Sequence, residues 1–127
     1  MADAKIPIVI LDDDPGSRRS MQMLLQGRGF QVRSFAVPEL LIADVRANNP
    51  VCLVTDYRMA GYDGLQVLDA LRAAGWMGKA ILVTAFSSPE LMQKAIAHGF
   101  ETVLDKPCKE SALVNAVIEA TARDMDP

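Results

Sequence analysis

Three aspartates stand side by side at positions 12, 13 and 14, directly after the apolar stretch at 7–11. Asp14 precedes Pro15, and because aspartate is a preferred N-cap residue and proline suits the first helical position, we expect Asp14 to cap a helix. Asp12 and Asp13 have no such task. Two carboxylates about 5 Å apart repel each other by about 3 kcal/mol at an effective dielectric near 20. A cluster of carboxylates therefore requires a cation or the protonation of one carboxyl group.

Further polar residues stand at the ends of three other apolar stretches: Asp56 after 51–55, Thr84 at the end of 80–84, and Lys106 after 102–104. The carboxyl ends of parallel strands meet at one edge of a sheet, so we expect Asp56 to lie near Asp12 and Asp13. Ligands that are all oxygen indicate magnesium, which accepts one or two carboxylates and leaves places for phosphoryl oxygens. Magnesium, the Lys106 ammonium and a hydrogen bond from the Thr84 hydroxyl could together stabilise the charge of a phosphoryl group that a carboxylate attacks.

The elements that must position these residues alternate between short apolar runs and longer helical patterns. We expect strands at 7–11, 31–35, 51–55, 80–84 and 102–104. We expect five helices between and after them, with these apolar faces: Met21, Leu24 and Leu25; Leu40, Leu41 and Val45; Leu65, Leu68 and Leu71; Leu91, Ala95 and Ile96; Leu113, Val114, Val117 and Ile118. Strands that are apolar on both faces and right-handed crossovers predict an α/β fold, a doubly wound five-stranded parallel sheet with helices on both faces.

Length and composition set limits on the protein's class. A chain of 127 residues, half of them hydrophobic, is expected to form a single domain over 1–127. The formal charge is −3 without a basic stripe, so we expect no direct binding of nucleic acid. No apolar run approaches the roughly 20 residues that span a bilayer, and the first residues do not resemble a signal peptide. We expect a soluble cytoplasmic protein with no membrane contact, in which Cys52 and Cys108 are reduced thiols.

The stretches "VILDDD", "VTDYRMAGYDG", "LVTAF" and "LDKP" resemble the receiver domain of bacterial two-component response regulators, from about Ile6 to Ala122. The resemblance implies a flavodoxin-like strand order 2-1-3-4-5 and a domain that is not an enzyme beyond its own phosphorylation and dephosphorylation. Its implied partners are a histidine kinase or a histidine phosphotransfer protein, which donates the phosphoryl group, and an output domain or effector protein, which receives the signal.

The resemblance also implies a role for each site residue. Asp56 matches the phosphoacceptor, and the pair Asp12 and Asp13 matches the residues that hold Mg²⁺ together with Asp56. Arg58 matches the position whose backbone carbonyl completes the metal site. Thr84 and Lys106 match the hydroxyl and ammonium that bind the phosphoryl group, and the Lys106–Pro107 peptide bond is expected to be cis.

Departures from the family pattern affect the signal path more than the site. Val103 stands where many receivers carry a tyrosine or phenylalanine that turns inward on activation, so we expect Phe86 in the loop after Thr84 to move instead. Ala60 and Cys108 replace a usual proline and phenylalanine. His98 is expected to end a helix before Gly99, and Asp63 to act as a turn or cap rather than as a metal ligand.

Two alternative functions belong to other classes. The aspartate triplet also fits the Asp-x-Asp pattern of haloacid-dehalogenase-like phosphatases, but a late acidic motif and a larger core are missing. A receiver-like interaction module that is never phosphorylated would not need the complete set of polar residues. Flavin or nucleotide binding is weaker still, because no glycine-rich loop follows the first strand.

Overall fold

The structure is a computed structural model that describes residues 5–125 of the chain. Five parallel strands form one sheet in the order β2-β1-β3-β6-β7. The strands are β1 (Pro7–Leu11), β2 (Gln31–Phe35), β3 (Cys52–Asp56), β6 (Lys79–Thr84) and β7 (Thr102–Asp105). Each expected strand is confirmed to within one residue at either end. Numbered within this sheet alone, the order is 2-1-3-4-5, which confirms the expected topology.

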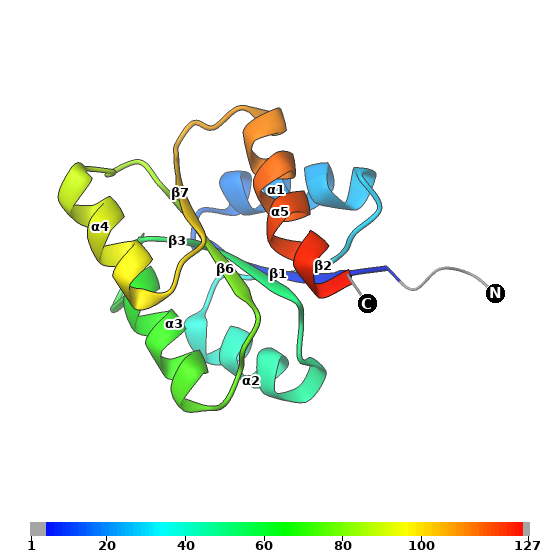
Figure 1. Cartoon of the computed structure of the whole chain (residues 1–127), viewed down its shortest axis with the longest axis horizontal. Coiled ribbons are helices and arrows are strands. Elements are labelled where there is room, and N and C mark those ends of the chain that lie inside the picture. The colour runs from blue at the N-terminus through cyan, green and yellow to red at the C-terminus, as the bar shows by residue number, and fades with distance from the viewer. Residues whose placement is uncertain (1–4, 126–127) are drawn as a thin grey trace.

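Five helices cover the two faces of the sheet. They are α1 (Pro15–Gly27), α2 (Pro38–Asn48), α3 (Gly64–Ala73), α4 (Pro89–His98) and α5 (Glu110–Met125). α1 and α5 pack on one face, whereas α2, α3 and α4 pack on the other (Figure 1). The doubly wound α/β fold is therefore confirmed. None of the helices in the described part of the chain has the length and apolar character needed to cross a membrane.

The core consists of two apolar layers, one on each side of the sheet. In β1, Ile8 and Ile10 belong to the layer under α1 and α5, and Val9 and Leu11 belong to the layer under the other three helices. All four side chains are fully buried. Because neighbouring side chains of a strand point to opposite faces, this explains why β1 is apolar at every position.

Three of the residues that the sequence assigns to the apolar helix faces are exposed, contrary to the prediction. Leu40 is 60% exposed, Ile96 52% and Ile118 49%. Each directly precedes or follows a buried residue of the same helix, and one residue turns a helix by about 100°. The adjacent position therefore points away from the buried face.

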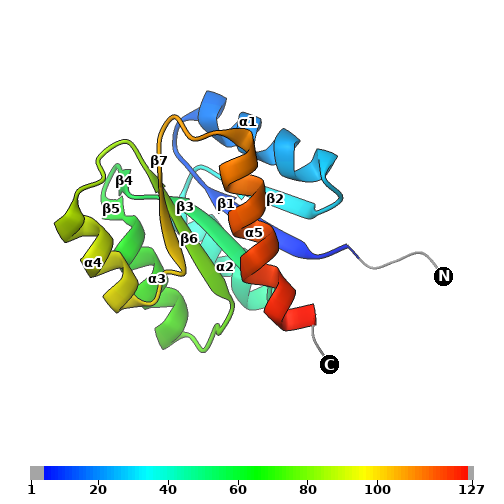
Figure 2. The ribbon, with the colours of Figure 1, turned by 45° about the horizontal axis from the view of Figure 1, so that its top comes forward.

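Two aspartates that the sequence assigns to helix caps have that role. The Asp14 carboxylate accepts a hydrogen bond from the Ser17 amide at 2.7 Å and begins α1. Asp63 begins α3 in a capping box, in which it and Gln66 each accept from the other's amide. A short antiparallel hairpin of β4 (Arg58–Met59) and β5 (Tyr62–Asp63), visible in Figure 2, was not predicted.

Candidate functional site

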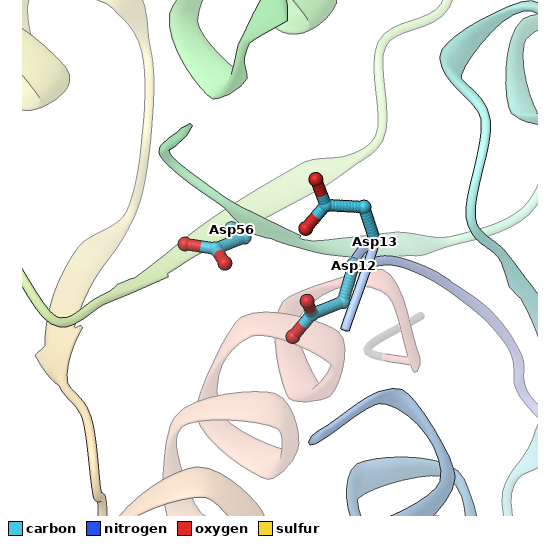
Figure 3. A group of neighbouring side chains, drawn as sticks. All are labelled: Asp12, Asp13 and Asp56. Carbon is cyan, nitrogen blue, oxygen red and sulfur yellow. The ribbon is translucent and has the colours of Figure 1, made fainter. Parts of the chain in front are cut away.

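Three carboxylates meet where β1 and β3 end (Figure 3). One carboxylate oxygen each of Asp12, Asp13 and Asp56 lies within 4.8 Å of the other two. Asp12 is fully buried, Asp56 is half-buried and Asp13 is exposed. The cluster forms because β1 and β3 are hydrogen-bonded neighbours, with Leu11 opposite Thr55. The expected gathering of the three aspartates is confirmed.

Lys106, the residue after β7, reaches this cluster from the other side of the sheet edge. Its Nζ donates to Asp12 Oδ2 at 2.7 Å and to Asp56 Oδ2 at 3.0 Å. The Lys106–Pro107 bond is cis, as expected. Asp12 is further fixed by the Asp14 amide, which donates to Asp12 Oδ1 at 2.9 Å. One ammonium thus bridges two carboxylates and leaves the cluster as a whole negatively charged.

The surroundings of the Asp56 carboxyl group oppose its ionisation. Burial raises the pKa of Asp56, and the negative charge of Asp12 acts in the same direction. The hydrogen bond and charge of Lys106 and the Tyr57 amide act to lower this pKa but do not outweigh the burial. For Lys106, burial acts to lower the pKa, but the hydrogen bonds and charges of Asp12 and Asp56 together raise it. Lys106 therefore carries its charge at neutral pH.

The backbone around Asp56 is closely packed. The Tyr57 amide donates to Asp56 Oδ1 at 2.7 Å, and the Gly64 amide donates to the Tyr57 carbonyl at 2.7 Å. A Cβ atom at position 64 would lie 2.5 Å from the Asp56 carbonyl oxygen and 2.9 Å from a methyl carbon of Leu82. Glycine is therefore needed where α3 begins against the end of β3.

Thr84 ends β6, the strand next to β3, and is fully buried. Its Oγ1 accepts a hydrogen bond from the Phe86 amide at 3.0 Å. Among the described residues the Thr84 hydroxyl makes no hydrogen bond to Asp56. The structure thus places Thr84 at the expected sheet edge, with its oxygen directed to the following loop.

Arg58 opens β4, two residues after Asp56. Its guanidinium carbon lies 4.7 Å from the centre of the Phe86 ring, so the side chain is in a cation–π contact rather than in the acidic cluster. The role expected for its backbone carbonyl remains a prediction.

Several contacts of the site were not predicted. The Ala60 amide approaches Asp13 Oδ2 at 3.4 Å. Ser87 donates a hydrogen bond to the carboxylate of Asp105. Both contacts join residues that only the folded sheet brings together, and no spacing in the sequence marks them.

The donor set suits a small hard cation. Carboxylate oxygens are the ligands of Mg²⁺ and Ca²⁺, and the cluster offers no thiolate or imidazole. Asp13 is the exposed member of the cluster. The site is therefore an acidic cluster in which one ammonium bridges two carboxylates, at the carboxyl edge of a doubly wound sheet.

In open α/β sheets, ligands bind beyond the carboxyl ends of the strands, which is where this acidic cluster lies. The fold and the cluster therefore place the chain in this class of α/β domains. The family model of the response regulator receiver domain matches residues 8–118 of the chain. The chain therefore belongs to the response regulator receiver domain family.

The chain is similar to curated proteins that are longer than it is. It is 31% identical over 122 residues to the transcriptional regulatory protein FixJ of Azorhizobium caulinodans, covering 95% of this chain and 57% of that protein. It is 28% identical over 123 residues to nodulation protein W of Bradyrhizobium diazoefficiens, covering 97% and 54%. The chain thus spans little more than half the length of these relatives.

Solved receiver domains have the same fold. The signal receiver domain of the response regulator NarL from Mycobacterium tuberculosis superposes with a TM-score of 0.83 at 27% identity, covering 92% of this chain and 96% of that one. The signal receiver domain of the Luxo repressor protein from Vibrio parahaemolyticus gives a TM-score of 0.89 at 18% identity, covering 94% and 92%. The second likeness concerns the fold alone.

Proposed function

We propose that this receiver domain, over residues 1–127, accepts a phosphoryl group on Asp56 from a histidine kinase or a histidine phosphotransfer protein. The observation that carries the proposal is the convergence of Asp12, Asp13, Asp56 and Lys106 on one point of the sheet edge. Asp56 is the acceptor because it alone of the three aspartates lies at the end of the central strand β3, between β1 and β6.

The transfer is a displacement at phosphorus. A carboxylate oxygen of Asp56 forms a bond to phosphorus while the bond from phosphorus to the donor's imidazole nitrogen breaks, and that nitrogen leaves with the electron pair. The product is an acyl phosphate. Lys106, which already lies 3.0 Å from Asp56 Oδ2, can bind a phosphoryl oxygen without leaving the site. Catalysis is then mainly positioning and charge neutralisation.

Asp12, Asp13 and Asp56, with the backbone carbonyl of Arg58, would hold Mg²⁺. Bound there, the ion would neutralise phosphoryl charge that Lys106 alone cannot balance. Asp12 is held in place by the Asp14 amide and by Lys106, so its carboxylate is oriented in advance. Among the described residues, Asp13 accepts a hydrogen bond from the Ala60 amide alone, at 3.4 Å, so its carboxylate is less restrained than that of Asp12.

The resulting switch signals to an output domain or effector protein. The similarity to longer proteins named as transcriptional regulators supports an output domain that acts on transcription. Contact with nucleic acid would then belong to the output domain. As part of the same proposal, we place the domain in the cytoplasm.

The test is chemical labelling. Incubation with acetyl phosphate and Mg²⁺ should add one phosphoryl group, hydroxylamine should remove it as it removes acyl phosphates, and omission of Mg²⁺ should prevent its addition. A label that resists hydroxylamine would contradict an acyl phosphate. The protein should show no multiple turnover of para-nitrophenyl phosphate; sustained turnover would favour the phosphatase alternative.

A further inference from the structure

The loop between β6 and α4, residues 85–88, is tied to a neighbouring strand end on each side. On one side the Phe86 ring lies against the guanidinium of Arg58, at 4.7 Å from ring centre to Cζ. On the other side the Ser87 hydroxyl donates to the carboxylate of Asp105, the last residue of β7. Ser88 then caps α4 by accepting from the Leu91 amide. Three of the four loop residues, Phe86, Ser87 and Ser88, therefore have a contact outside the loop.

The position of this loop determines what the Thr84 hydroxyl can do. The fully buried Thr84 accepts through Oγ1 a hydrogen bond from the amide of Phe86, a residue that is 56% exposed. Threonine has few staggered rotamers, so turning the hydroxyl toward Asp56 removes the acceptor of that amide. The hydrogen bond that joins Thr84 to the loop is therefore lost when Thr84 turns, so the position of the loop and the rotamer of Thr84 are coupled. Contacts that hold the loop thus act on Thr84.

Asp105 can affect Thr84 through its contact with Ser87, because it takes no part in the ion pairs that Lys106 makes with Asp12 and Asp56. Its register partner in β6 is Thr84, and the Lys106 amide donates to the Thr84 carbonyl at 2.8 Å. The Lys106 ammonium, however, is bonded to Asp12 and Asp56. The Asp105 carboxylate is exposed at the strand end and bonds to the Ser87 hydroxyl.

We propose that Asp105 is a positioning residue that, through Ser87, holds the 85–88 loop in the arrangement in which the Thr84 hydroxyl is bonded to the Phe86 amide. The Ser87–Asp105 contact thereby opposes the turn of the Thr84 hydroxyl toward a phosphoryl group on Asp56. The inference rests on the proposed role of Asp56 as acceptor. It assigns the restraint on activation to a pair of residues that lie outside the acidic cluster.

The test uses beryllium fluoride, a mimic of the aspartyl phosphate, in the presence of Mg²⁺. Ser87→Ala and Asp105→Ala should each raise the affinity for beryllium fluoride about fivefold, the factor that corresponds to one ordinary hydrogen bond. The double variant should gain no more than either single variant, because both changes remove the same contact. Asp105→Asn keeps an acceptor oxygen for Ser87 and should behave like the wild type. Affinity for Mg²⁺ alone should be unchanged in all four variants.

Hydrogen exchange in the unliganded protein gives a second readout. Both alanine variants should exchange the Phe86 amide faster than the wild type, whereas Asp105→Asn should not. Unchanged Phe86 exchange in both alanine variants would overturn the proposal.

Two results of the binding experiment would also overturn it. One is unchanged or lower affinity in both alanine variants. The other is an equal gain in beryllium fluoride affinity in Asp105→Asn and Asp105→Ala, with no gain in Ser87→Ala. The charge of Asp105 would then affect the site without the hydrogen bond to Ser87. A wild type that binds no beryllium fluoride would instead contradict the proposed function of Asp56.

Discussion

At the residue scale, the adjacent aspartates Asp13 and Asp14 have different partners. Asp14 accepts from the Ser17 amide at 2.7 Å and caps α1, whereas Asp13 belongs to the acidic cluster and is exposed. The same side chain therefore caps a helix at position 14 and belongs to the acidic cluster at position 13.

This difference predicts opposite results for two substitutions. Asp13→Asn should lower the affinity for Mg²⁺ by about tenfold, or about 1.4 kcal/mol, without lowering stability in the absence of metal, because one of three repelling charges is removed. Asp14→Ala should lower the free energy of unfolding by about 1 kcal/mol and leave Mg²⁺ affinity unchanged. Titration calorimetry and thermal unfolding measure both. An Asp13→Asn variant that melts earlier without metal would contradict the assignment.

Asp56 predicts a dependence of stability on pH. Burial raises its pKa above the ordinary 3.8, so the folded state binds this proton more readily than the unfolded state does. The contribution of the group to stability is then fully present below the unfolded pKa and is lost as the pH rises through the folded pKa. Asp56→Asn removes the buried charge, and Lys106 keeps its bond to Asp12.

The metal-free Asp56→Asn variant should therefore be more stable than the wild type at pH 7, and the difference should shrink as the pH falls toward about 4. Denaturant unfolding at both pH values, with a chelator present, measures this. An Asn variant that is less stable than the wild type at pH 7 would show that Lys106 outweighs the burial of Asp56.

At the element scale, the close approach of α3 to the end of β3 depends on Gly64. A Cβ there would lie 2.5 Å from the Asp56 carbonyl oxygen, which is backbone and cannot rotate away. At Gly27, the last residue of α1, a Cβ would meet nothing within 4 Å. The two positions form a matched pair.

Gly64→Ala should lower the free energy of unfolding by about 2 kcal/mol through overpacking and should also weaken Mg²⁺ binding, because Asp56 must shift. Gly27→Ala should be neutral or stabilise by up to about 1 kcal/mol, because alanine is the better helix former. Equal stability of Gly64→Ala and the wild type would contradict the packing described here.

The sequence predicts the elements well where one physical rule dominates. The central strands β1, β3 and β6 are recognisable because both of their faces are buried. The site could be predicted because parallel strands bring Asp12, Asp56 and Lys106 to one edge. The two-residue strands β4 and β5 are too short to carry a periodic pattern. Leu40 shows that an apolar residue beside a buried stripe is not always inside, and the Ser87–Asp105 contact depends on side-chain directions that only the fold sets.

At the scale of the whole molecule, Trp76 lies at the end of the fold opposite the acidic cluster. It precedes β6, is 4% exposed, and donates from its indole nitrogen to the Pro50 carbonyl at 2.8 Å. Trp76 and Thr84 lie at opposite ends of β6, and about five strand residues at about 3.3 Å each place them about 17 Å apart along the strand. Its contacts lie in the layer shared by α2, α3 and α4.

Trp76 fluorescence should accordingly report global unfolding but scarcely change when Mg²⁺ is added to the folded protein. A fluorescence titration with Mg²⁺, followed by denaturant unfolding of the same sample, checks both statements. Strong quenching by Mg²⁺ would mean that the metal binds elsewhere or that the far end of the sheet responds to it.

The central claim is that Asp56 accepts the phosphoryl group, and the most direct measurement is the intact mass of the wild type and of Asp56→Asn after incubation with acetyl phosphate and Mg²⁺. The wild type should gain one phosphoryl group and Asp56→Asn none, because the amide is not a competent nucleophile. Asp69→Asn, a change on the exposed face of α3, should label like the wild type. Undiminished labelling of Asp56→Asn would contradict the account.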